Sequence, residues 1–231
     1  MIKTIMQRLW DAAEKMYMRN IFDMLEKDED AILLDCGCDD GRNTLEIAQG
    51  IGTNNIYGIE IIKARAHEAQ KKGINVFNSD LNERFPLEDE SVDVILANQV
   101  IEHLANADSF VGEIHRVLRR GGYAIVCTEN LASWHNILSL VFGWQPFSLT
   151  NISLKRLGIG NPFALHRGEE AFNRHWLHVE LFAYRGLLEI IEANGLKVEA
   201  VSGAGYYPLL SIIGQVDKRH AAFLTVKARK G

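Results

Sequence analysis

The segment best suited to bind a ligand is an apolar run that ends in an acid and two glycines. Residues 31–34 are apolar, Asp35 follows them, and Gly37 and Gly41 lie on either side of Cys38 and two further acids. Four apolar residues bounded by turn formers predict a strand buried on both faces, with a helix after Gly41. A strand, a glycine-containing loop and a helix in this order are typical of a ligand-binding loop.

The spacing and charge of this loop indicate which ligand it would hold. Dinucleotide-binding loops need G-x-G-x-x-G, whereas Gly37 and Gly41 are separated by Cys38, Asp39 and Asp40. Acids near a helix N-terminus disfavour a pyrophosphate and favour a cationic ligand. An oxidoreductase that binds NAD or a nucleotide sugar is therefore the weaker alternative, and the sequence also has no Tyr-x-x-x-Lys pair.

Two further acids end the next predicted strands, at residues 55–60 and 74–80. Glu60 is suited to accept two charge-assisted hydrogen bonds from a ribose diol, and Asp80 could accept one from an adenine amine. Alternatively, Glu60 is a solvated acid at a strand end, and Asp80 begins an Asx turn. The recurrence of acids at successive strand ends favours the ligand-binding interpretation.

Strands and helices alternate through the remaining sequence. Alternation of this kind predicts an α/β, doubly wound sheet of mainly parallel strands. Ligands bind such sheets beyond the carboxyl ends of the strands, which places Asp35, Glu60, Asp80 and Asn98 on one rim. The later predicted elements are strands at 91–98, 123–128, 196–202 and 221–227, with helices at 107–120 and 181–194.

The first loop and the fourth strand carry a family resemblance. Asp35, Gly37 and Gly41 resemble motif I of the class I S-adenosylmethionine-dependent methyltransferases of the small-molecule type, with Asp39 in place of the middle glycine. Residues 91–104 resemble the fourth strand and following turn of that family, where a Glu-His pair is common. The resemblance covers residues 31–128, and the family includes the kinds known as methyltransferase 11 and 23.

The resemblance implies a Rossmann-like sheet of seven strands with an antiparallel last strand and helices on both faces. It implies S-adenosylmethionine as cofactor and S-adenosylhomocysteine as product, with in-line transfer of the methyl group to an acceptor. We expect a small-molecule or a lipid- or sugar-linked acceptor, methylated at oxygen. A non-catalytic module that binds the cofactor is a further alternative. The residues expected to bind the cofactor are Asp35, Gly37, Cys38, Gly41, Glu60, Ile61, Asp80, Leu81, Asn98, Gln99 and Val100.

Histidine is the side chain whose ordinary pKa suits proton removal at neutral pH. His103, after the fourth strand, and His178, before the last predicted helix, are the catalytic candidates. Each could instead fix local structure. An aromatic insertion follows the fifth strand and is expected either to line the acceptor pocket or to pack its own small core. The expected pocket residues are Asn130, His135, Trp144 and Trp176, and the other aromatic residues of the insertion are Trp134, Phe147, Phe163 and Phe172.

Length and composition predict one domain with an N-terminal extension. The 231 residues divide into an amphipathic helix within residues 1–30 and a methyltransferase domain over 31–231 with an insertion at about 131–180. A net charge of −5 disfavours a nucleic-acid partner. The three cysteines match neither a disulfide framework nor a zinc site, so no metal is predicted.

The N-terminus does not resemble a signal peptide, which predicts a cytoplasmic protein. Residues 137–142 and 209–213 are apolar and allow peripheral contact with a membrane, although short apolar segments more often lie in the core. Lys155, Arg156 and Arg167 could bind a phosphate or carboxylate on the acceptor. No motif indicates an oligomeric state.

Overall fold

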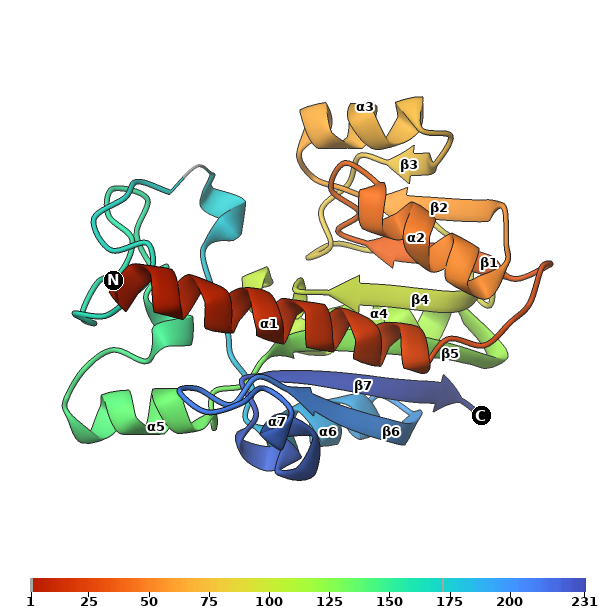
Figure 1. Ribbon diagram of the computed structural model, residues 1–231. Coiled ribbons are helices and arrows are strands. Elements are labelled where there is room, and N and C mark those ends of the chain that lie inside the picture. The colour runs from red at the N-terminus through yellow and green to blue at the C-terminus, as the bar shows by residue number, and fades with distance from the viewer. Residues whose placement is uncertain (1, 172) are drawn as a thin grey trace.

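A sheet of seven strands with helices on both faces forms the centre of the protein (Figure 1). This computed structural model describes residues 2–171 and 173–231, so Met1 of the predicted N-terminal helix and Phe172 of the insertion lie outside the described residues. The strands are β1 (Ile32–Cys36), β2 (Asn55–Ile59), β3 (Asn75–Phe77), β4 (Val92–Asn98), β5 (Leu118–Glu129), β6 (Leu196–Ala204) and β7 (Phe223–Lys230). The helices are α1 (Ile2–Asp23), α2 (Arg42–Ile51), α3 (Lys63–Lys71), α4 (Ala107–Val117), α5 (Trp134–Val141), α6 (Tyr184–Ala193) and α7 (Ile213–Val216).

The strand order β3-β2-β1-β4-β5-β7-β6 confirms the predicted topology. Strand β1 pairs in parallel with β2 on one side and with β4 on the other. Strand β7 lies between β5 and β6 and is antiparallel to both. The carboxyl ends of β1, β2 and β4 therefore meet at one edge of the sheet, as the acids at those strand ends require.

Each face of the sheet has its own helical layer and core. On one face, Ala13, Tyr17 and Ile21 of α1 pack with Ile47 and other residues of α2 against the central strands. On the other face, the buried sides of α4 and α6 pack against the same strands. Figure 1 shows α1 lying along the sheet in front, with α4 and α6 behind it. The predicted N-terminal helix is thus part of the core, because one apolar stripe of it is buried on the sheet.

Several element boundaries differ from the sequence-based expectation. The helix predicted over 107–120 ends at Val117, because the next residue, Leu118, is fully buried and pairs with Val92 of β4. The strand predicted over 74–80 is confined to β3, and the helix predicted over 181–194 begins only at Tyr184. Tertiary pairing decides such ends, since the local sequence permits either state.

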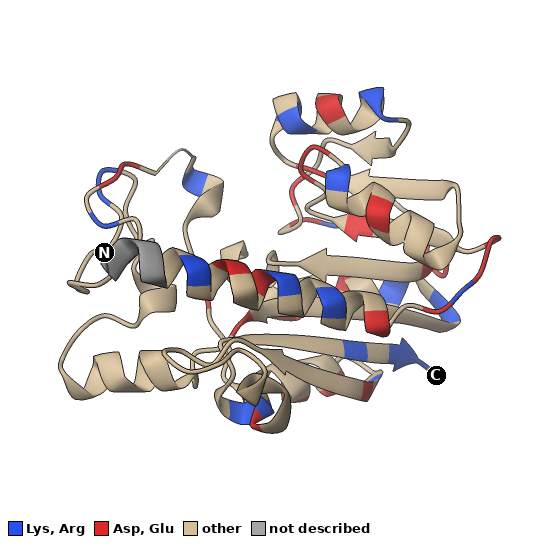
Figure 2. Ribbon diagram, viewed as in Figure 1, with Lys and Arg blue, Asp and Glu red and all other residues tan. Residues whose placement is uncertain are grey.

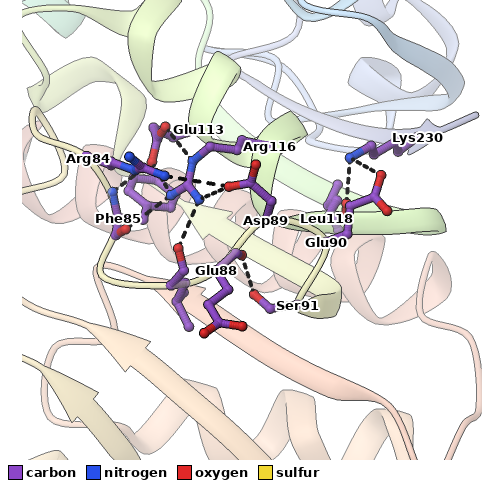
Figure 3. A network of polar contacts seen from close by, with 11 residues as sticks. Arg84, Phe85, Glu88, Asp89, Glu90, Ser91, Glu113, Arg116, Leu118 and Lys230 are labelled. Atoms are coloured by element: carbon purple, nitrogen blue, oxygen red, sulfur yellow. Dashed lines mark hydrogen bonds and ion pairs between the residues drawn. The ribbon is translucent and has the colours of Figure 1, made fainter.

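Arg116 joins the end of α4 to the loop that leads into β4 (Figure 3). Its guanidinium donates hydrogen bonds to the carbonyl oxygens of Phe85 and Leu87 at 3.1 and 2.9 Å. It also donates to the carboxylates of Glu113 at 2.6 Å and Asp89 at 2.7 Å. The nearby carboxylate of Glu113 raises the pKa of Arg116 further above its ordinary value. This network lies at the amino end of β4, at the opposite end of that strand from Asn98.

Replacing Arg116 with alanine should lower the free energy of unfolding by about 2 kcal/mol, because two backbone carbonyls and two carboxylates lose a charged donor. Urea unfolding followed by circular dichroism measures the change. Arg120→Ala is the matched control, since its side chain is 82% exposed, and it should shift stability by less than about 0.5 kcal/mol. Equal stability of the two variants would mean that the network contributes nothing.

Candidate active site

A cavity of about 580 Å³ lies at the carboxyl ends of the parallel strands. Ten of the predicted cofactor-binding residues line it, namely Asp35, Gly37, Cys38, Glu60, Ile61, Asp80, Leu81, Asn98, Gln99 and Val100. Gly41 is the exception. It precedes α2 with φ +80°, and its N–H donates to the carbonyl of Cys38 at 2.8 Å. Gly41 therefore shapes the loop from outside the cavity lining.

The loop after β1 depends on left-handed backbone conformations. Gly37 has φ +78°, and a Cβ atom there would come within 2.6 Å of Val100, so only glycine fits. Asp39, which stands where the family motif has glycine, has φ +46°. Aspartate adopts this region more readily than most residues, which explains how the loop keeps its course without the middle glycine.

Asp35 is buried at the end of β1 beside this loop. Its Oδ2 accepts a hydrogen bond from the hydroxyl of Thr44 on α2 at 2.6 Å. Burial raises the pKa of Asp35 to about 7, and the nearby charge of Glu60 acts in the same direction. A buried carboxylate that is costly to ionise alone is a favourable site for a cationic group.

Glu60 lies at the rim of the cavity, directly after β2. Its two carboxylate oxygens accept backbone N–H groups, one from Asp39 at 3.0 Å and one from Ile62 at 2.7 Å. Burial raises the pKa of Glu60, while these two hydrogen bonds act against the shift. A carboxylate has about four lone-pair sites. The two backbone N–H groups therefore leave acceptor capacity on Glu60 for a donor in the cavity, as binding of a ribose hydroxyl requires.

Asp80 and Asn98 complete the polar wall. The Oδ1 of Asp80 accepts from both the backbone and the side-chain amide of Asn82, at 2.9 and 2.8 Å, so the Asx turn forms in a residue that also lines the cavity. The buried Oδ1 of Asn98 has no hydrogen-bond partner among the described residues. A buried acceptor without a donor is unfavourable, so this atom fits a ligand that brings a donor.

The cavity wall carries more negative than positive side chains. Asp39 and Asp40 face Arg65 at 3.2 Å and Arg42 at 3.4 Å, and Lys72 lies 3.3 Å from Asp40. Figure 2 shows acids gathered at the loop after β1. The inner acids Asp35 and Glu60 have no such cationic partner among the ion pairs of the described residues, so the interior favours a cation.

A second, larger cavity of about 900 Å³ adjoins the first. The two share Tyr17, Asp39, Gln99, His103 and Trp176 in their linings. The apolar part of the second lining comes from α1, α5 and the insertion, with Met6, Leu9, Trp10, Leu138, Phe142, Trp144, Phe147 and Phe163. The N-terminal helix thus forms part of its wall, which helical periodicity alone did not indicate.

His103 and His178 lie together where the cavities meet, with ring centroids 4.9 Å apart. The Nδ1 of His103 lies 3.0 Å from the carbonyl oxygen of Leu177, and the Nδ1 of His178 lies 2.6 Å from that of Ser148. A carbonyl can only accept, so each Nδ1 carries a proton, and the neutral ring of His103 keeps a lone pair on its Nε2. Burial lowers the pKa of His103 to about 4, which keeps it neutral near pH 7.

Glu102 is a functional candidate that the sequence analysis missed. Its side chain is buried in the second lining, and its Oε2 accepts from the hydroxyl of Thr128 at 2.8 Å. Burial raises the pKa of Glu102 to about 7, while the nearby His178 opposes this shift. The sequence signal that could have identified Glu102 is its position directly before His103 in the Glu-His pair. Tyr17 and Trp10 were also missed, because the helical pattern of residues 1–30 does not show which of its aromatic side chains line a cavity.

The remaining predicted pocket residues divide into two groups. His135, Trp144 and Trp176 line the second cavity, and burial lowers the pKa of His135 to about 3. Asn130 is fully buried and lines neither cavity. Its side chain donates to the backbone carbonyls of Arg219 and Ala221 at 2.9 and 2.8 Å, so it joins β5 to the segment before β7.

None of the three basic residues suggested for anion binding lies in the second lining. Lys155, Arg156 and Arg167 are exposed and absent from it. The guanidinium of Arg167 instead donates to the carbonyls of Gly158 and Asn161, at 2.9 and 2.8 Å, within the insertion.

Comparison with known proteins identifies the family of the domain in this chain. Residues 34–126 match the family model described as Methyltransferase domain. The chain contains a class I methyltransferase domain. The matched residues run from β1 to β5 and include the whole polar wall of the first cavity. Membership implies S-adenosylmethionine as the cofactor and S-adenosylhomocysteine as its product. The carboxylates, the lone acceptor of Asn98 and the glycine loop fit that cationic, donor-rich ligand.

Individual relatives support the same family. A probable S-adenosylmethionine-dependent methyltransferase of Mycolicibacterium smegmatis is 38% identical over 42% of this chain and 38% of its own length. The mitochondrial ubiquinone biosynthesis O-methyltransferase of Rattus norvegicus is 26% identical over 76% of this chain and 47% of its own length. This chain therefore spans less than half the length of these curated relatives. A solved S-adenosylmethionine-dependent methyltransferase of Thermotoga maritima shares the fold, with a TM-score of 0.63, 16% identity and complete coverage of both chains.

Replacing Glu60 with alanine should weaken binding of S-adenosylhomocysteine by more than about tenfold, or about 1.4 kcal/mol, because a ribose diol loses a charged acceptor. Isothermal titration calorimetry measures the affinity. Glu46→Ala on the exposed side of α2 is the control, since it removes the same charge outside both linings. An unchanged affinity in the Glu60 variant would remove this residue from the site.

Affinity for S-adenosylmethionine should fall as pH drops, because protonation of Asp35 removes a negative charge beside a cationic ligand. With the pKa of Asp35 at about 7, the carboxylate is ionised above that pH and neutral below it. We expect a decrease of about tenfold between about pH 8 and pH 6. Asp35→Asn should bind weakly at both, and Glu46→Gln should keep the wild-type dependence. A dependence that persists in Asp35→Asn would assign it to another group.

Proposed function

We propose that this protein transfers a methyl group from S-adenosylmethionine to a hydroxyl oxygen of an apolar small molecule or lipid-linked acceptor. The observation that carries the proposal is the position of His103, on the wall common to a polar, acidic cavity and an apolar cavity. One cavity suits the cofactor and the other suits the acceptor. The residue between them is a neutral histidine with a free Nε2 lone pair.

The composition of the second lining supports an apolar, uncharged acceptor. Among the described residues, no Lys or Arg lines this cavity, so no ammonium or guanidinium group is available for a phosphate or carboxylate. Its volume is at the upper end for a small-molecule site, and its walls are rich in aromatic rings. The names of two relatives, the ubiquinone biosynthesis O-methyltransferase and the sterol 4-C-methyltransferase of Caenorhabditis elegans, support a lipid-like acceptor.

Orientation and exclusion of water supply most of the rate enhancement in this proposal. The cofactor, when bound, supplies a methyl group on a positively charged sulfur, which is already a good electrophile. Tyr17, Gln99 and Trp176 bound both cavities and would hold the acceptor against the cofactor side. The apolar rings around them keep water from competing as the acceptor.

His103 would remove the proton from the acceptor hydroxyl at its Nε2. The hydrogen bond from Nδ1 to Leu177 fixes the tautomer and the direction of the ring. The ring of His178 packs against it at an interplanar angle of 69°. The low pKa of His103 keeps Nε2 unprotonated through the neutral range, so the lone pair is present whenever the acceptor binds.

His103→Gln should lower kcat about a hundredfold or more while leaving the affinity for S-adenosylhomocysteine within about twofold, because it removes the base and keeps the cavity. Single-turnover assays with phenolic and lipid-linked alcohols as acceptors, alongside calorimetry, separate the two quantities. His67→Gln on the exposed side of α3 is the control. Equal turnover would make His103 a structural residue, and cofactor binding without turnover on any acceptor would favour a non-catalytic module.

A further inference from the structure

Helix α5 has its polar side chains inside and its apolar side chains outside. Asn136 and Ser139 are buried, while Leu138, Val141 and the following Phe142 are 48, 73 and 64% exposed. A surface helix of a water-soluble domain normally buries its apolar stripe. Figure 2 shows that α5 carries no Lys, Arg, Asp or Glu. The reversed arrangement indicates that this side of the protein contacts an apolar medium or partner.

The inward polar face of α5 is held by specific hydrogen bonds. The amide of Asn136 donates to the carbonyl of Asn130 and to the hydroxyl of Ser148, both at 3.0 Å. The amide of Asn161 donates to the hydroxyl of Ser139 at 3.2 Å. Rotation of the helix to bury its leucines would leave these groups unpaired, at a cost of about 1–3 kcal/mol each. The outward apolar face is therefore built into the fold.

A second apolar segment lies beside α5. Trp134, at the start of α5, donates a hydrogen bond from its indole to the hydroxyl of Tyr206 at 2.7 Å and stacks on His220 with centroids 4.6 Å apart. These contacts join α5 to the segment between β6 and β7. Together the two segments form what we call the docking surface, made of Leu138, Leu140, Val141, Phe142, Leu209, Leu210, Ile212 and Val216, each about half exposed or more.

The docking surface is continuous with the mouth of the acceptor cavity. Leu138 and Phe142 belong to the docking surface and also line that cavity, and Pro208 lines it immediately before Leu209. An acceptor that enters the cavity must therefore pass this surface. A protein partner or second copy seated here would cover the entrance. A fluid lipid surface would leave it open and would itself hold apolar acceptors.

Charge next to the docking surface also suits a bilayer. Residues 130–154 contain no Asp, Glu, Lys or Arg, which removes the cost of bringing charges to a lipid surface. Lys218 and Arg219 follow Val216 after Asp217, whose carboxylate pairs with His220 at 2.9 Å and accepts from the hydroxyl of Tyr206 at 2.7 Å. The two basic side chains would face the headgroup layer. Trp134 and Phe142 are side chains of the kind enriched at membrane interfaces. None of the helices in the described ranges has the length and apolar character needed to cross a bilayer.

We propose that the docking surface binds the surface of a lipid bilayer that contains anionic lipids, and that the acceptor enters the second cavity directly from it. The entry of the acceptor rests on the proposed methyl transfer, whereas attachment to lipid can be measured without cofactor or acceptor. The exposed apolar side chains insert among the headgroups, and Lys218 and Arg219 pair with lipid phosphates.

Flotation of the full chain with vesicles of phosphatidylcholine containing a minor fraction of phosphatidylglycerol tests the attachment. The triple variant Val141→Ser, Leu210→Ser and Val216→Ser alters exposed positions that line neither cavity. Wild-type protein should float with the vesicles, and the affinity of the serine variant for the vesicles should be lower by about tenfold or more. The matched control, Val141→Leu, Leu210→Ile and Val216→Leu, keeps the apolar character and should float like the wild type.

Three outcomes would decide against attachment to lipid. Wild-type protein that stays unbound, or serine and control variants that float equally, would overturn the proposal. Light scattering after gel filtration tests whether a second copy of the chain occupies this surface instead. A wild-type dimer that becomes a monomer in the serine variant would make this surface a contact between copies. Titration with S-adenosylhomocysteine should be unchanged in the serine variant. Flotation without methyl transfer to any acceptor would count against the proposed function alone.

Discussion

Parallel pairing of β1 with both β2 and β4 is the constraint on which the rest of the structure depends. The register aligns Cys36 with Ile59 and with Ala97, so three strands end together. Asp35, Glu60 and Asn98 consequently share one buried rim, although they are far apart in the chain. Their burial raises the pKa values of the two acids and leaves the Asn98 oxygen without a partner. The gathering of buried acids at this rim is thus a consequence of strand order.

The second cavity is built differently, from segments that the sheet does not align. Helix α1 lies on one face of the sheet and brings Trp10 and Tyr17 to the cavity, while the insertion supplies the opposite wall. The insertion has buried polar residues such as Asn136 and Asn161, which hold its turns by hydrogen bonds. Because polar side chains fill the interior of the insertion, its apolar side chains lie at the cavity and on the outer surface. For this reason Leu138 and Phe142 can line the second cavity and also belong to the exposed apolar surface.

The parts of the fold that sequence patterns predicted are those with a strong local signal. The apolar run before Gly37 marked β1, the apolar run at residues 94–97 marked β4, and acids at strand ends marked the rim of the first cavity. The family resemblance, and not periodicity, supplied the order of β5, β7 and β6. The predicted end of α4 was wrong because Leu118 is helix-permitting locally but pairs with Val92 in the sheet. Asn130 was assigned to the pocket by analogy, whereas its amide bonds the backbone near β7.

The sequence by itself determined the class of fold, the acidic glycine loop and which strand ends line the first cavity, because these depend on residue type and on the order of the strands. Only the tertiary structure decided how the rings of His103 and His178 are oriented, since the carbonyls of Leu177 and Ser148 that accept from their Nδ1 atoms come from distant segments. It also decided which face of α5 is buried. Helical periodicity shows that a helix has two faces, but the hydrogen-bond partners of Asn136 and Ser139 determine which one points inward.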